Sequence, residues 1–165
     1  MDYKPFIALA VLLPATAWAQ DAHYPTRRAG LWEGTANVGN STVLSKSCVD
    51  TATDRKMIDY GYQKLKEHGG QVEVKVDGNI VHVSSVAQVA NHTMTIEQIL
   101  TFHSDAKVTG TGHTTIDPPF PQMAASMPTD STSEQHWVGP CPADMKPGDI
   151  VTNGQKHNVG DMVSK

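Results

Sequence analysis

Apolar and polar residues alternate along the chain from Val72 onward, and short turn sequences interrupt the alternation at regular intervals. Because successive side chains of a β-strand point to opposite faces, this pattern predicts antiparallel strands that each bury one face. Asp77-Gly78-Asn79 predicts a tight turn, and Ala90-Asn91 and Ser104-Asp105 predict the next two turns. The stretch 72–116 is therefore expected to form four strands of a meander.

A hairpin and a helix are expected before this meander. The stretch 31–48 is rich in strand-forming residues and is broken by Gly39-Asn40, which predicts a hairpin. The stretch 53–67 carries helix formers at helical spacing, with Thr53 as the expected N-cap and Gly69 among the residues that end the helix.

A last strand is expected at 131–138, which would return the chain toward Cys141. These elements together predict an α+β fold: a twisted antiparallel meander of about six or seven strands, able to curl toward a half-barrel, with one packed helix. The face expected to be buried comprises Trp32, Val72, Val74, Val81, Val83, Met94, Ile96, Leu100, Phe102 and Val108.

The first 19 residues have the features of a signal peptide. Lys4 precedes the apolar run 6–13, and Ala17-Trp18-Ala19 has the small-x-small pattern of a cleavage site after Ala19. The apolar run is too short to span a bilayer, which needs about 20 such residues. The expected division of the 165 residues is a signal peptide at 1–19, a polar lead-in at 20–30, one sheet-rich domain at 31–141 and an irregular C-terminal tail at 142–165.

The charge of the chain limits its partners. A formal net charge of -4 gives no electrostatic reason to bind nucleic acid or an anionic membrane. No integral membrane segment is expected after signal cleavage.

Export would place the two cysteines, Cys48 and Cys141, in an oxidising compartment, where they can form only one intramolecular pair. We therefore predict a Cys48–Cys141 disulfide. Redox-active dithiols usually lie close together as CxxC, and the wide spacing of this pair favours a structural role.

Histidine is frequent in the chain, with eight residues, and one weak metal-binding pattern is present. His92 and Met94 would share a strand face, and Met123 and Met127 lie in a proline-rich loop expected at 117–128. Imidazole and thioether groups both suit copper, so these four residues form a candidate copper site in an exported protein. The alternative is that Met94 is a core residue and that the two loop methionines cover the open edge of the core.

The expected register also predicts a polar row on the outer face of the sheet. If Phe102 pairs with Val108 and Ala87 pairs with Met94, Ser84, Glu97 and His113 lie side by side on three strands. Serine, histidine and a carboxylate suggest a hydrolase, but the carboxylate would separate the serine from the histidine. Ordinary cross-strand pairing explains the row better, and no catalytic residue is assigned.

Three sequence pieces resemble a known family. They are Gly30-Leu31-Trp32-Glu33, Cys48-Val49-Asp50 and Trp137-Val138-Gly139-Pro140-Cys141. Together they resemble a family of exported proteobacterial proteins that is catalogued only as a domain of unknown function, and the resemblance covers about residues 28–150. It implies a periplasmic location and a small sheet-rich domain, and it implies no reaction.

These observations favour a non-enzymatic periplasmic protein that binds a small apolar ligand or acts in envelope maintenance. A curved sheet, a helix and the 117–128 loop would enclose the ligand, and no cofactor is expected. The alternatives are a copper-binding protein that uses His92, Met94, Met123 and Met127, and, third, a hydrolase-like enzyme.

Overall fold

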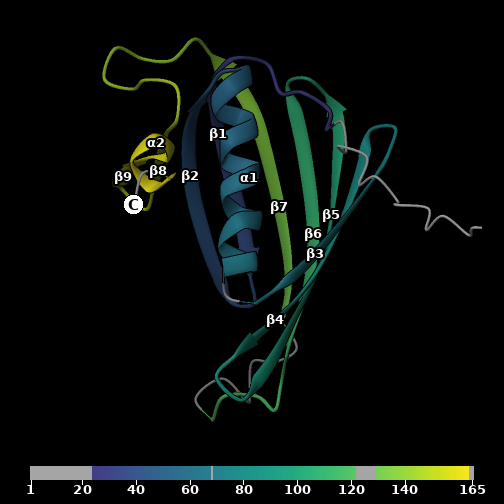
Figure 1. The fold of residues 1–165 in the computed structure, drawn as a ribbon. Coiled ribbons are helices and arrows are strands. Elements are labelled where there is room, and N and C mark those ends of the chain that lie inside the picture. The colour runs from purple at the N-terminus through teal and green to yellow at the C-terminus, as the bar shows by residue number, and fades with distance from the viewer. Residues whose placement is uncertain (1–23, 68, 122–128, 164–165) are drawn as a thin grey trace, which may run out of the picture.

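The computed structural model describes residues 24–67, 69–121 and 129–163. Within these residues nine antiparallel strands form one open sheet in the order β3-β4-β5-β6-β7-β1-β2-β8-β9, accompanied by two helices (Figure 1). The elements are β1 Gly30–Val38, β2 Ser41–Val49, α1 Thr51–Glu67, β3 Gln71–Asp77, β4 Ile80–Val89, β5 His92–Ser104, β6 Lys107–Asp117, β7 Thr129–Gly139, β8 Asp149–Thr152, β9 Gln155–Asn158 and α2 Val159–Val163.

The central meander has the register that its alternation predicts. Phe102 pairs with Val108 between β5 and β6, and Ala87 pairs with Met94 between β4 and β5. The expected class, mostly antiparallel sheet with a packed helix, is confirmed, but the sheet has more strands than the six or seven expected.

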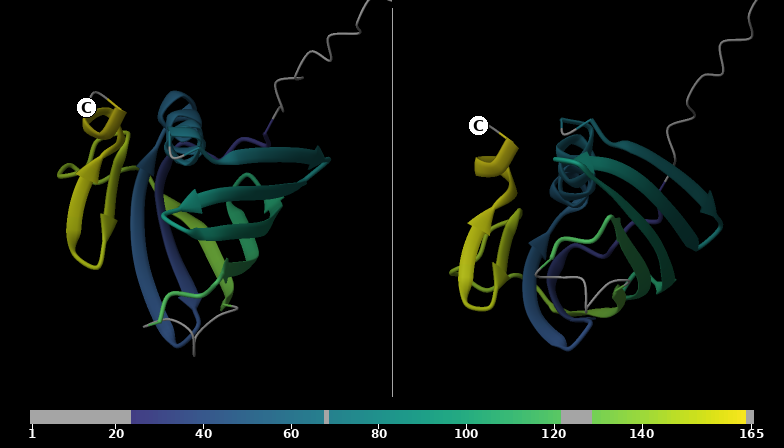
Figure 2. Two further views of the ribbon diagram at one scale, coloured as in Figure 1. Left: turned by 60° about the horizontal axis from the view of Figure 1, so that its bottom comes forward. Right: turned by 90° about the horizontal axis from the view of Figure 1, so that it is seen from below.

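The first strand lies in the middle of the sheet. β1 pairs with β2 on one side and with β7 on the other, so that a strand from the start of the fold joins one from near its end. The sheet curves strongly, and α1 lies along its concave side (Figure 2). The helix packs against β2 on one side and against β3 and β4 on the other.

Helix α1 begins two residues earlier than the sequence predicts. The carboxylate of Asp50 accepts a hydrogen bond from the backbone N–H of Thr53 at 2.8 Å, and the Thr53 hydroxyl accepts one from the N–H of Asp50 at 2.9 Å. This reciprocal arrangement is a capping box. The bonds from Thr53 lower the pKa of Asp50. The N-cap is thus Asp50, and Thr53 is its partner inside the helix.

The core lies on the concave face beneath α1. Trp32, Val81 and Phe102 are buried there, as expected. Met94 and Ile96 belong to the same face but remain partly exposed. The other buried or half-buried residues of this cluster are Val49, Val83 and Val108, with Tyr24, Met57, Tyr62, Val72, Val74, Val76, Leu100 and Trp137 packed around them.

The C-terminal tail is not irregular, and this part of the sequence prediction is wrong. β8 pairs with β2, β9 pairs with β8, and α2 follows directly. The turn between the two strands is Asn153-Gly154, with φ of 49° and 82°. Asn-Gly with both residues at positive φ is typical of a two-residue hairpin turn, and this signal was available in the sequence.

Candidate functional site

A nearly buried ion pair lies on the concave face under α1. Both Nε and Nη2 of Arg27 donate hydrogen bonds to Oδ1 of Asp54 on the helix, at 2.9 and 2.5 Å. Nη1 donates to the side-chain oxygen of Gln135 on β7 at 2.7 Å, and the guanidinium lies 5.3 Å from the ring centre of Trp32. The sequence predicts only a polar lead-in at 20–30. In the structure, Arg27 of this lead-in connects α1 to the sheet.

A small cavity of about 170 Å³ adjoins this ion pair. Arg27 and Gln135 give it polar groups, and Trp32, Met57 and Ile150 give it apolar walls. The volume of this cavity gives room for a few non-hydrogen atoms.

The concave face becomes more open toward the turn between β1 and β2. Most of its side chains there are apolar or small and partly exposed, in contrast to Trp32 and Phe102 under the helix. Ala87 and Ile116, the two partners of Met94, are buried. The sheet extends below the C-terminal end of α1 at this end (Figure 1). The partly exposed residues include Gly34, Ala36, Val43, Met94, Ile96, Gln98, Gly112, Thr114, Ser131 and Ser133.

Two of the four residues proposed for copper fall within the described part of the chain. Nδ1 of His92 contacts the backbone oxygen of Pro118, and its ring lies 3.9 Å from that of Phe120 between centres. Met94 lies two residues along the same strand, on the concave face. Met123 and Met127 lie outside the described residues. In the part that is described, no three His, Cys, Asp or Glu side chains are grouped so as to hold a metal ion.

The polar row on the outer face forms with the predicted register. Ser84 pairs with Glu97, and Glu97 pairs with His113. Ser84 and His113 are thus two strands apart, about 9.6 Å at the usual strand spacing, which prevents direct contact. His113 instead makes a 2.7 Å contact through Nδ1 with Asp130 of β7, a partner that the sequence analysis missed.

A shallow depression of about 450 Å³ lies on the outer face beside this row. Ser84, Glu97 and Ile99 are among the residues that line it. Because Ser84 and His113 cannot touch, the row contains no paired nucleophile and base and has the properties of a paired sheet surface.

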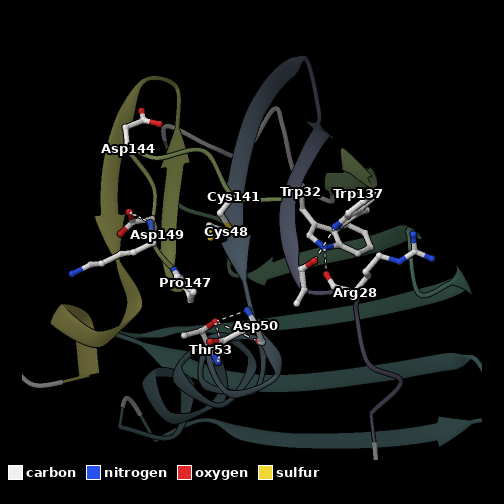
Figure 3. The surroundings of a disulfide bond; sticks show 12 residues. Arg28, Trp32, Cys48, Asp50, Thr53, Trp137, Cys141, Asp144, Pro147 and Asp149 are labelled. Atoms are coloured by element: carbon white, nitrogen blue, oxygen red, sulfur yellow. Dashed lines mark hydrogen bonds between the residues drawn. A yellow bond between two sulfur atoms is a disulfide. The ribbon is translucent and has the colours of Figure 1, made fainter. Parts of the chain in front are cut away.

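The disulfide lies where the C-terminal hairpin meets the sheet. Cys48 of β2 and Cys141 are bonded, as predicted, with their Cα atoms 5.6 Å apart (Figure 3). The backbone N–H of Gly148 donates to the oxygen of Cys48 at 2.8 Å, and Val159 is buried nearby. These contacts hold β8, β9 and α2 against β2.

A second, polar cavity lies between this C-terminal unit and α1, with a volume of about 690 Å³. Asp149 is buried in its wall and accepts hydrogen bonds from Asn158 at 2.7 Å and from the N–H of Lys146 at 3.0 Å. Burial raises the pKa of Asp149, but these bonds and nearby Lys156 outweigh it, and the net pKa is lowered. Because its carboxylate is already paired, we assign this cavity no ligand.

The structure defines an architectural class of protein. Its members would have a curved, open antiparallel sheet with a helix on the concave side and a partly open inner face. Comparison with protein-family models, with curated proteins and with solved structures finds no match. In the described residues, none of the helices combines the length and the apolar character needed to cross a membrane.

Proposed function

We propose that this protein is a non-enzymatic periplasmic binding protein that holds a small apolar ligand on the concave face of its sheet. The observation that carries the proposal is the group of partly exposed apolar and small side chains at the open end of that face, represented by Ala36, Met94 and Ile96. Partly exposed apolar surface on a concave face favours the burial of an apolar ligand.

The proposed location rests on two further observations. The Cys48–Cys141 disulfide fits an oxidising compartment, and the start of the sequence has the features of a signal peptide. The resemblance to exported proteobacterial proteins supports the same compartment. Native mass spectrometry of protein isolated from the periplasm would test this proposal, because a retained organic mass is expected.

A matched pair of substitutions tests the location of the ligand. Ala36 and Thr35 are neighbours on β1 and point to opposite faces, with Ala36 on the concave side and Thr35 exposed on the outer side. Ala36→Phe fills the concave face, and we expect it to weaken binding of the uncharged fluorescent probe N-phenyl-1-naphthylamine by about tenfold or more. Thr35→Phe adds the same side chain to the outer face and should leave binding unchanged.

The probe titration has two outcomes that contradict the proposal. One is the absence of saturable fluorescence enhancement with the unsubstituted protein, and the other is an equal effect of the two substitutions. Circular dichroism of both variants shows whether each remains folded, so that a loss of binding can be separated from a loss of structure.

A further inference from the structure

Strand β3 forms a free edge of the sheet. It is the terminal strand in the sheet order, and among the described residues only β4 pairs with it. Unpaired edge strands present a row of backbone N–H and C=O groups that can pair with another strand. The edge of β3 is therefore a surface on which a further strand could add.

The hairpin turn determines which backbone groups face outward. Asp77 pairs with Ile80 across the two-residue loop Gly78-Asn79, so this pair closes the turn with a backbone hydrogen bond. Bonded and non-bonded pairs alternate along antiparallel strands. The residues whose N–H and C=O groups point toward the free edge are consequently Val72, Val74 and Val76.

The sequence of β3, Gln-Val-Glu-Val-Lys-Val-Asp, is complementary to itself about Val74. In an antiparallel pair of two such strands with a two-fold axis at Val74, Val72 lies opposite Val76 and Glu73 lies opposite Lys75. The two strands therefore form three cross-strand valine pairs on the concave face and two ion pairs on the outer face. Both charged side chains are well exposed, with relative accessibilities of 66% for Glu73 and 73% for Lys75. Within one copy Nζ of Lys75 lies 3.1 Å from Oε1 of Glu73, so association would exchange this pair in each copy for the two pairs between copies.

Neighbouring registers are electrostatically unfavourable. A two-fold axis at Glu73 places two glutamates directly opposite each other, and an axis at Lys75 does the same with two lysines. Like charges at directly opposed positions destabilise strand pairing. Charge therefore disfavours both of these registers. An axis at Val76 would place Lys75 opposite Asp77, but it pairs only part of the strand, whereas the axis at Val74 pairs all seven residues.

We propose that two copies of this protein associate through their β3 edges, with Val74 on the two-fold axis, to form one continuous antiparallel sheet. The axis is perpendicular to the sheet, so both α1 helices lie on the same side. The half-buried valines of each β3 pack beside those of the other copy. Three valine pairs face each other across the axis, and each pair exchanges two backbone hydrogen bonds, which gives six in total. This association is independent of the ligand proposed above.

Charge reversal tests the ion pairs. We expect analytical ultracentrifugation of a dilution series to show a monomer–dimer equilibrium. Lys75→Glu places glutamate opposite glutamate at both pairs and should raise the dimer dissociation constant by about tenfold or more. Combining it with Glu73→Lys exchanges the two charges and should restore the equilibrium. Lys107→Glu disrupts a comparable exposed ion pair, with Glu134 on β6 and β7, and should leave it unchanged.

Cysteine crosslinking tests the register. The native cysteines are joined in their disulfide, so one added cysteine can react only between copies. Val74→Cys lies opposite itself, at the Cα separation of about 5.5 Å of a hydrogen-bonded pair, and should form a covalent dimer under mild oxidation. Val72→Cys lies opposite Val76 and should not. A monomer at every concentration, or equal crosslinking of the two variants, would overturn the proposal.

Discussion

Arg27 and Arg28 are adjacent in the sequence, but their guanidinium groups occupy different environments. The Arg27–Asp54 pair is nearly buried, with side-chain accessibilities of 14% and 10%, whereas the Arg28–Asp105 pair has 45% and 53%. Removal of one partner from a buried pair leaves an uncompensated charge, which is costly, whereas an exposed pair contributes little. Both arginines hold the lead-in against the rest of the fold, but only the burial of Arg27 requires a charged partner to be stable.

Two aspartate substitutions compare these environments. Asp54→Ala leaves Arg27 nearly buried without its carboxylate, and we expect it to lower the free energy of unfolding by about 3–5 kcal/mol. Asp105→Ala should lower it by about 1 kcal/mol or less, because water solvates Arg28. Urea unfolding followed by circular dichroism measures both values. Equal losses in the two variants would contradict the difference in burial.

The buried carboxylate of Asp149 predicts a pH dependence. Its folded-state pKa is lowered, although burial alone would raise it, because Asn158, the Lys146 N–H and Lys156 stabilise the charged form. The unfolded chain therefore binds a proton at higher pH than the folded one does, with a pKa of about 3.9. The resulting stability is complete above that value and is lost as the pH falls through the folded pKa.

Asp149→Asn tests this dependence. The variant should be less stable than the original protein at neutral pH, and the difference should shrink as the pH falls below about 4. Thermal unfolding at a series of pH values gives the comparison. A constant difference across that range would show that the charge of Asp149 does not contribute.

Glycines on the concave face allow β6 and β7 to approach within the curved sheet. An added Cβ at Gly110 would lie 2.6 Å from the Ser133 hydroxyl and 2.9 Å from Cδ2 of Leu100. A Cβ at Gly112 would lie 2.5 Å from the Ser131 hydroxyl. Neighbouring side chains thus fill the space above both glycines that a Cβ would need, which is a close approach typical of glycine within a strand.

Glycine-to-alanine substitutions should have opposite effects in the two kinds of element. Gly110→Ala crowds Ser133 and Leu100, and we expect a loss of about 1–3 kcal/mol in the free energy of unfolding. Gly61 lies on the exposed side of α1, and outside the helix's own backbone no atom is within 4 Å of the methyl group that Gly61→Ala would add. We expect this substitution to raise the free energy of unfolding by about 0.5–1 kcal/mol. Chemical denaturation measures both, and a neutral Gly110→Ala would show that the strands can relax.

The elements that could be predicted from sequence are those with local signals. Alternation and the turns at Gly78, Asn91 and Asp105 predict the registers of β3 to β6, and the disulfide follows from having two cysteines. The predicted start of α1, with Thr53 as N-cap, is wrong because the capping box begins at Asp50 and Thr53 is its second member. The sequence prediction omitted β8 and β9 although Asn153-Gly154 signals their turn, because strands of only four residues carry little alternation; β8 is stabilised by pairing with β2, and β9 by pairing with β8.

The candidate site was less predictable than the fold. Alternation assigns Ala36 and Ile96 to the inner face, but the degree of their exposure depends on how far α1 reaches across the curved sheet. Arg27 and Asp54 are 27 positions apart, one in the lead-in before β1 and the other on α1. No repeating pattern in the sequence relates these two segments, so their contact could not be predicted. Asp130, the partner of His113, depends likewise on the pairing of β6 with β7.

The disulfide acts on the molecule as a whole. It joins residues 93 positions apart and thereby restricts the unfolded chain from β2 to the end of β7. By the chain-entropy argument this closure stabilises the fold by about 4–5 kcal/mol. We expect a Cys48→Ala, Cys141→Ala double variant to lose a large part of this stability in urea unfolding, and an unchanged unfolding midpoint would contradict the argument.

The central position of β1 has a consequence for the order of folding. β1 and β2 form one local hairpin unit and β3 to β6 form another, and only β7 pairs with both. A chain that emerges from its amino end can form each unit early, because their contacts are short-range. The two units become one sheet only when residues up to Gly139 have emerged. Until then the edges of β1 and β6 are open to incorrect pairing, so we expect the chain to be most prone to aggregation before β7 has emerged and paired.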